Sequence, residues 1–92
     1  MSEYIEIESE LSDDGQQIYL YTNLTLTEQG TETYDSIEAM EEGSPLVQAL
    51  VIIDGIARLR LEDRDMIITL TPDADWHVVV ADVSAAIKDF FL

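Results

Sequence analysis

The stretch GSPLVQALVIIDGIARLRLEDRDMIITLTPDADWHVVVADVSAAIKDFF, residues 43–91, carries the clearest structural pattern in the chain. Its start favours a helix, because Ser44 is a preferred N-cap residue and Pro45 suits the first helical position. The apolar residues that follow fall on one helical face: Leu46, Ala49, Leu50 and Ile53. Gly55 then stands where a glycine commonly ends a helix. The pattern predicts a helix over residues 44–53.

A β-hairpin is predicted directly after this helix. Residues 56–61 alternate between two faces, one with Ile56, Arg58 and Arg60 and the other with Ala57, Leu59 and Leu61. The polar run at 62–65 is typical of a turn. Residues 66–71 then form a second apolar and partly β-branched stretch, which favours the returning strand.

The end of the quoted stretch favours a second helix. Residues 72–75 contain a proline and two acids, a composition that ends a strand and suits the start of a helix. Apolar residues then recur at helical spacing: Trp76, Val80, Val83, Ile87 and Phe90. We expect Trp76, Val80 and Val83 to pack on the apolar face of the preceding hairpin.

The first half of the chain predicts another hairpin. Residues 4–8 alternate apolar and acidic side chains, residues 13–15 have turn chemistry, and apolar residues alternate again over 18–26. Residues 29–32 interrupt this pattern, and residues 36–40 fit one acidic helical turn.

These segments together predict a single domain over residues 1–92. Its class is α+β, with two layers in the order ββ-α-ββ-α. In this arrangement the helices cover one face of an antiparallel sheet and the other face is open to water.

The quoted stretch resembles the N-terminal domain of Nfu/NifU-like iron–sulfur cluster scaffold proteins. The resemblance rests on Ser-Pro-Leu opening a helix, Ile-Asp-Gly-Ile at 53–56, a hairpin ending in Ile-Thr at 68–69, and a C-terminal pattern of Asp75, Trp76, Ala86, Ile87 and Phe90. It implies a non-enzymatic protein-interaction or accessory domain associated with iron–sulfur cluster assembly or delivery. It also implies the family's association with iron ions.

The chain departs from the family pattern in two respects. Residues 9–14 read Ser-Glu-Leu-Ser-Asp-Asp, where the family has a proline-containing motif between its first two strands. Longer family members also carry a Cys-x-x-Cys domain that holds the cluster, and these 92 residues contain no such domain. The resemblance therefore implies a stand-alone accessory domain that has no cofactor of its own.

The composition restricts the expected partners. Twenty Asp and Glu residues stand against four Lys and Arg residues, which gives a formal net charge of -16. Such a surface repels the phosphates of nucleic acids and anionic lipids, so we expect neither nucleic-acid nor membrane binding. The absence of cysteine excludes thiolate ligation of a cluster or of zinc by this chain. The lack of a signal peptide or a long apolar segment predicts a cytoplasmic protein.

Candidate metal ligands are few. Asp73 lies four residues before His77, the single histidine, but two ligands alone do not close a metal site. Carboxylate-based iron binding is the alternative function, because carboxylates are hard oxygen ligands, although the chain has no Glu-x-x-His pair. No nucleophile, histidine and acid form a recognisable set, so we expect no catalytic residues and no enzyme activity.

Two groups of residues are candidates for partner binding. Arg58 and Arg60 share one strand face and form a small cationic area, which we expect on the open face near acids of the first hairpin. Phe91 and Leu92 follow Phe90 directly, and adjacent helical residues cannot all face the core. We expect a monomer that binds a protein partner, either an iron–sulfur assembly factor or a client protein.

Overall fold

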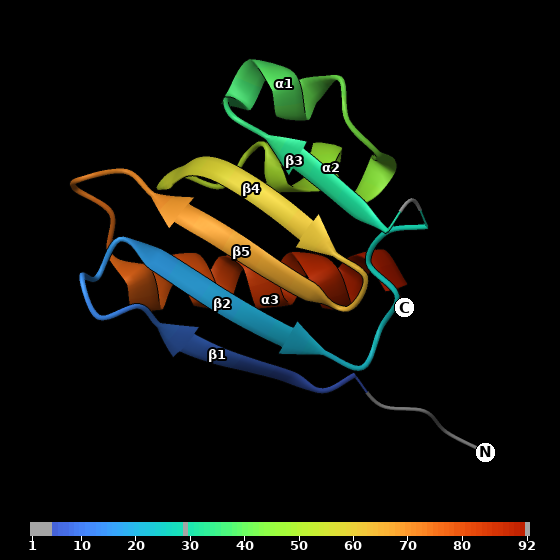
Figure 1. Ribbon diagram of the computed structural model, residues 1–92, viewed down its shortest axis with the longest axis horizontal. Coiled ribbons are helices and arrows are strands. Elements are labelled where there is room, and N and C mark those ends of the chain that lie inside the picture. Colours follow the sequence, from blue (N-terminus) through green and yellow to red (C-terminus); the bar gives the residue numbers. More distant parts are fainter. Residues whose placement is uncertain (1–4, 29, 92) are drawn as a thin grey trace.

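The computed structural model describes residues 5–28 and 30–91. Within this part of the chain, an antiparallel sheet has the strand order β1-β2-β5-β4-β3 (Figure 1). The strands are β1 (Ile7–Leu11), β2 (Gln17–Thr22), β3 (Thr31–Tyr34), β4 (Ile56–Glu62) and β5 (Asp65–Leu70). The expected α+β class and the antiparallel sheet are confirmed.

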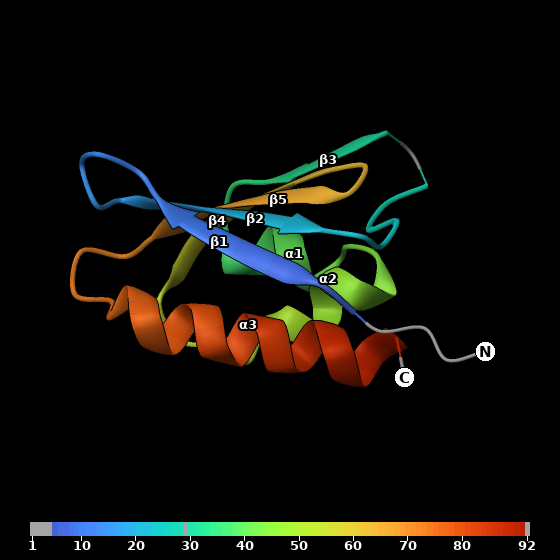
Figure 2. The ribbon, with the colours of Figure 1, turned by 90° about the horizontal axis from the view of Figure 1, so that it is seen from below.

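In residues 5–28 and 30–91, three helices lie on one side of this sheet and the opposite side carries no helix (Figure 2). They are α1 (Ile37–Glu41), α2 (Pro45–Leu50) and α3 (Trp76–Phe91). The side chain of Ser36 caps α1 by accepting a hydrogen bond from the backbone N–H of Ala39 at 3.1 Å. None of the helices in the described part of the chain has the length and apolar composition needed to cross a bilayer.

The two predicted hairpins are present. β1 pairs with β2 through a turn in which Gly15 has a φ of 72°, a left-handed conformation that glycine adopts without steric cost. β4 pairs with β5 through a turn at Asp63, whose φ is 52°. β2 and β5 join the two hairpins in the middle of the sheet, where Ile18 lies opposite Ile68.

β3 was not predicted from the sequence. It pairs antiparallel with β4 and forms an edge of the sheet, so that Thr33 lies opposite Arg60. In a half-buried strand, apolar side chains usually face the core and charged side chains face water. In β3 the acidic residue Glu32 is buried instead, and its two threonine neighbours are exposed. A polarity pattern alone cannot identify such a strand.

The predicted faces of β4 needed one correction. Ile56 was placed on the face of Arg58 and Arg60, but it is 2% exposed and belongs to the core. The register between β4 and β5 shifts between Ile56 and Arg58, so Ala57 is an extra residue in the strand. This bulge changes the phase of the alternation and turns Ile56 inward, beside Leu59 and Leu61.

The core lies between the sheet and the helices. The sheet contributes Ile18, Leu20, Ile56, Leu59, Leu61, Met66, Ile68 and Leu70, and the helices contribute Met40, Leu46, Val47, Leu50, Val79, Val83 and Ile87. In α3 the buried stripe contains Val79 where Val80 was expected, and Trp76 and Val80 pack at the margin. Phe90, expected on this stripe, is 43% exposed.

The end of α2 also differs in detail from its prediction. The helix ends at Leu50, before Ile53, although Ile53 is still buried. Gly55 follows with a φ of 102°. A Cβ atom at Gly55 would lie 2.7 Å from Cγ2 of Val79, so a glycine here also permits α3 to approach the start of β4.

Candidate docking surface

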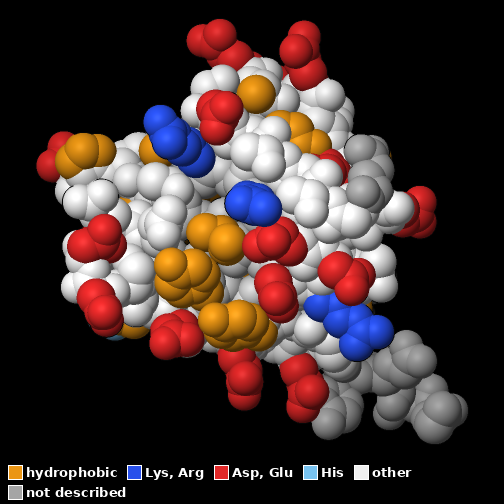
Figure 3. All heavy atoms as spheres, viewed as in Figure 1, with side chains coloured by type: hydrophobic (Ala, Val, Ile, Leu, Met, Phe, Trp, Pro, Cys, Tyr) orange, Lys and Arg blue, Asp and Glu red, His pale blue; other side chains and the backbone are white. Residues whose placement is uncertain are grey.

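The side of the sheet without helices presents a continuous set of side chains from all five strands. We name this surface the open face, and the strand registers and exposures define it as Glu8, Glu10, Gln17, Tyr19, Tyr21, Thr31, Thr33, Arg58, Arg60, Glu62, Asp65, Ile67 and Thr69. Figure 3 shows apolar side chains gathered near the middle of this side, with basic side chains beside them and acidic side chains around them.

The centre of the open face combines apolar and cationic groups. Tyr19 lies opposite Ile67, and Ile67 lies opposite Arg60 on the next strand. The Tyr19 hydroxyl donates to Oε1 of Gln17 at 3.2 Å, and Nε2 of Gln17 donates to Oγ1 of Thr69 at 3.4 Å. These residues surround a shallow hollow of ≈ 210 Å³ that Arg58 also lines.

The two arginines are exposed on the open face, as their alternation predicted. Nη2 of Arg60 lies 3.5 Å from Oε2 of Glu62 on the same strand. The arginines are expected near acids of the first hairpin, but among the described residues they form no ion pair with those acids, because β5 separates β4 from β2. Among the described residues, Arg58 has no ion pair, so its guanidinium is available for another carboxylate.

The second candidate lies elsewhere. Phe91 is 38% exposed at the end of α3, and its ring contacts that of Phe90 edge to face with centroids 5.2 Å apart. Because α3 lies on the helical side of the sheet (Figure 2), Phe91 and the two arginines do not share one surface. Leu92 lies outside the described residues.

The candidate metal ligands do not converge. Asp73 lies in the turn before α3 and therefore has no helical i, i+4 relation to His77. Nδ1 of His77 instead lies 3.7 Å from Oδ1 of Asp75, with both side chains largely exposed. In residues 5–28 and 30–91, no three His, Cys, Asp or Glu side chains gather as metal ligands would.

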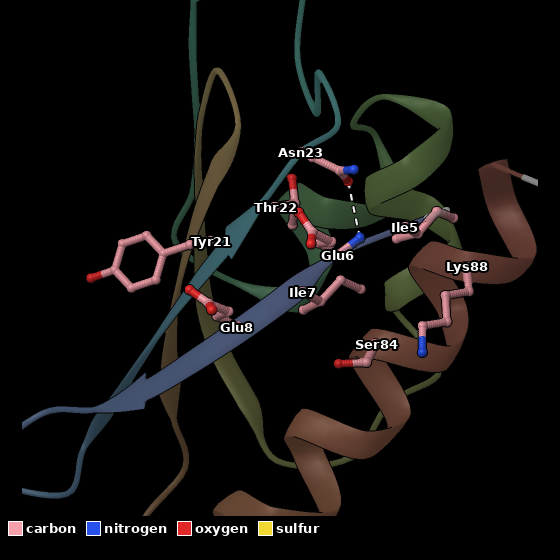
Figure 4. A pocket seen from close by; sticks show the side chains of 9 residues that line it. All are labelled: Ile5, Glu6, Ile7, Glu8, Tyr21, Thr22, Asn23, Ser84 and Lys88. Atoms are coloured by element: carbon pink, nitrogen blue, oxygen red, sulfur yellow. Dashed lines mark hydrogen bonds between the residues drawn. The ribbon is translucent and has the colours of Figure 1, made fainter. Parts of the chain in front are cut away.

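A groove of ≈ 530 Å³ lies between the edge of the sheet and α3, and the sequence did not predict it. Figure 4 shows Ile7 from β1 facing Ser84 and Lys88 from α3 across this groove. At its end, the backbone N–H of Glu6 donates to Oδ1 of Asn23 at 3.0 Å. Lys88 is the one basic residue in the last turn of α3 and lines this groove.

Glu32 is the most unusual acid in the described chain. Its residue is 8% exposed, and its carboxylate accepts a hydrogen bond from the hydroxyl of Tyr34. Burial raises the pKa of Glu32, but hydrogen bonds from Thr27, Tyr34 and Ser44 outweigh burial and leave the pKa below its ordinary value. Burial and the neighbouring carboxylate raise the pKa of Tyr34. Glu32 is therefore ionised and Tyr34 is a neutral donor at neutral pH.

Comparison with known proteins finds a matching family and a solved structure of similar fold. The family described as scaffold protein Nfu/NifU N terminal matches residues 7–92. A crystal structure of protein SAV1430 from Staphylococcus aureus superposes with a TM-score of 0.71 and 12% sequence identity, covering 89% of this chain and 98% of that one. This likeness shows a shared fold. No curated protein matches the chain.

Proposed function

Because the chain belongs to the Nfu/NifU N-terminal family, whose role lies in iron–sulfur cluster scaffolding, we propose that it acts there as a non-enzymatic protein-interaction domain. The open face with Arg58 and Arg60 is the docking surface for its protein partner. The observation that carries this proposal is a cationic and aromatic area on the uncovered side of a strongly acidic domain.

The chemistry of the open face suits protein recognition. Tyrosine and arginine contribute a large share of the binding energy in protein interfaces, because they combine apolar area with directed hydrogen bonds. Tyr19, Tyr21 and Ile67 offer the apolar area, and Arg58 offers a guanidinium that has no ion pair within the described part of the chain. A partner with apolar residues and a carboxylate at matching positions would bury this apolar area and pair with the guanidinium of Arg58.

Long-range electrostatics restrict how this partner approaches. The net charge of -16 repels another acidic protein everywhere except near a local positive area. The partner would therefore place its own acidic group against Arg58 and a neutral or basic surface against the rest of the domain. This arrangement favours one orientation of the complex.

The cluster itself is cargo for the partner. Iron–sulfur clusters are held almost entirely by cysteine thiolates, and this chain contains no cysteine. Its contribution would be to hold a cluster-carrying protein next to the protein that receives the cluster. No step of this role requires chemistry by the chain itself.

A pull-down from the native host tests the proposal. Tagged wild-type protein should capture iron–sulfur assembly factors or cluster-containing clients, identified by mass spectrometry. Arg58→Glu combined with Arg60→Glu should abolish their capture, while Arg64→Glu, at the exposed β4–β5 turn, serves as the matched control. A folded double variant that captures the same proteins as wild type would move the docking surface elsewhere, with Phe91 as the next residue to replace.

Calorimetric titration with ferrous iron separates this proposal from carboxylate-based iron binding. An interaction domain should show only the weak, salt-sensitive heat that is expected of an acidic surface. Saturable binding at one site that survives high salt would favour the iron-binding alternative.

A further inference from the structure

A hollow of ≈ 410 Å³ opens on the helical side of the molecule, away from the open face. We name it the Glu32 pocket, and its defining residues are Thr27, Glu32, Ser44, Leu46, Phe90 and Phe91. It lies where β3, the start of α2 and the end of α3 meet. Three segments that are distant in the sequence therefore form one cavity.

The carboxylate of Glu32 carries a charge that the described chain does not balance. The ion pairs among residues 5–28 and 30–91 involve Glu62 and Asp75, so Glu32 has no cationic partner there. Burial of a charge without an opposite charge is unfavourable, even where neutral hydrogen bonds reduce its cost. Such a carboxylate attracts a cation that reaches it through the pocket.

The carboxylate also has capacity for a further donor. An ionised carboxylate offers about four acceptor positions on its two oxygens. Tyr34 donates to Oε1, Thr27 supplies a further hydrogen bond, and Ser44 lies close enough to help lower the pKa of Glu32. Among residues 5–28 and 30–91, the buried Ser44 hydroxyl oxygen has no partner at standard hydrogen-bond geometry, so it does not take up an acceptor position of Glu32 in full. A stronger, charged donor would complete the set.

The walls of the pocket favour the same type of ligand. Phe90 and Phe91 stand at 75° to each other, so a cation that enters the pocket can lie over the negative face of a ring. The end of α3 adds the negative pole of a sixteen-residue helix. Glu28, which also lines the pocket, and the net charge of -16 raise the local concentration of cations.

We propose that the Glu32 pocket binds an arginine side chain presented by a partner protein. A guanidinium is planar, stacks on aromatic rings and donates two parallel hydrogen bonds to a carboxylate, whereas an ammonium is a compact and strongly hydrated charge. The proposal rests on the docking role above only for the source of the arginine. The recognition chemistry belongs to the pocket itself.

The test uses the intact protein and Nα-acetyl-arginine methylamide as the probe, followed by NMR at constant ionic strength. The probe should shift the amide signals of Thr27, Glu32, Ser44 and Phe90 in a saturable manner. Glu32→Gln should weaken binding about tenfold, because it removes the charge from the hydrogen-bonded acceptor. Glu38→Gln, which removes one charge from exposed α1, should bind like wild type and is the matched control.

A second variant keeps the test decisive if Glu32→Gln does not fold. Phe91→Ala leaves the buried network intact and should weaken binding several-fold through loss of the aromatic wall. Shifts spread evenly over acidic residues, or the same shifts with potassium chloride alone, would overturn the proposal. The Arg58→Glu and Arg60→Glu double variant should bind the probe as tightly as wild type. The experiment on the open face and the experiment on the Glu32 pocket therefore test the two proposals separately.

Discussion

The hydroxyl of Tyr34 donates a hydrogen bond to the carboxylate of Glu32, two residues earlier on the same strand. Both side chains lie on the helical side of β3, opposite Leu59 and Leu61 of β4. The same hydroxyl accepts a hydrogen bond from the backbone N–H of Ser44 at 3.4 Å. This pair therefore connects an edge strand to the start of α2 and keeps a buried charge solvated by protein groups.

Tyr34→Phe tests the contribution of this contact to stability. The substitution keeps the ring but leaves a buried carboxylate with one donor fewer, so the free energy of unfolding should fall by about 1–3 kcal/mol. Chemical denaturation at neutral pH measures the loss. Tyr21→Phe is the matched control, because its hydroxyl meets Glu10 at an exposed position, and it should change stability little. Equal effects of the two substitutions would contradict the role assigned to Tyr34.

The pH dependence of stability should contain a contribution from Glu32. Its pKa is lower in the folded protein than the ordinary value of 4.5, so the unfolded chain binds this proton more readily. The stabilisation is complete above the unfolded pKa and is lost as pH falls through the folded pKa. The stability advantage of wild type over Glu32→Gln should therefore shrink as the pH falls from about 6 to about 3.

The comparison with Glu38→Gln isolates this contribution from general charge effects. That variant also removes one negative charge, but from an exposed position on α1. Its stability difference from wild type should change much less over the same pH range. A parallel pH dependence for both variants would show that Glu32 is not specifically stabilised in its ionised form.

Replacing both arginines of the open face should leave the fold intact. The pair between Arg60 and Glu62 is on the surface, with the arginine side chain 51% exposed, and such pairs contribute about 0–1 kcal/mol. Arg58→Glu with Arg60→Glu should therefore unfold in the same cooperative transition as wild type, measured by circular dichroism in moderate salt. Loss of that transition would assign the arginines a structural role in place of docking.

Salt should raise the melting temperature. The net charge of -16 on a small domain produces repulsion that favours the unfolded chain. Salt shortens the Debye length from about 10 Å at 0.1 M to about 3 Å at 1 M and screens this repulsion. Thermal unfolding followed over this range of sodium chloride should show a steady increase, and a constant melting temperature would disprove the expected dominance of charge repulsion.

Reconstitution with iron and sulfide should produce no stable cluster on this chain. The reason is the complete absence of cysteine, because carboxylate and imidazole groups rarely hold such clusters alone. Visible absorption after desalting and assay of bound iron and sulfide provide the measurement. Stoichiometric iron and sulfide retained after desalting would contradict the assignment of the cluster to a partner.

The sequence by itself determined the features that depend on neighbouring residues. The hairpin turns at Gly15 and Asp63, the start of α2 at Pro45 and the outward position of Arg58 and Arg60 follow from local backbone preferences and from period-two alternation. These preferences act over a few residues, so a linear pattern records them.

Only the tertiary structure decided the strand order, β3 and the position of Glu32. The pairing of β3 with β4 joins residues that are distant in the chain, and the bulge beside Ala57 reverses the face of Ile56. An acid in the core violates the polarity rule and is tolerated because Tyr34, Thr27 and Ser44 converge on it. That convergence exists only after three separate segments have packed together, which is why the local pattern identified the arginines of the open face and missed the Glu32 pocket.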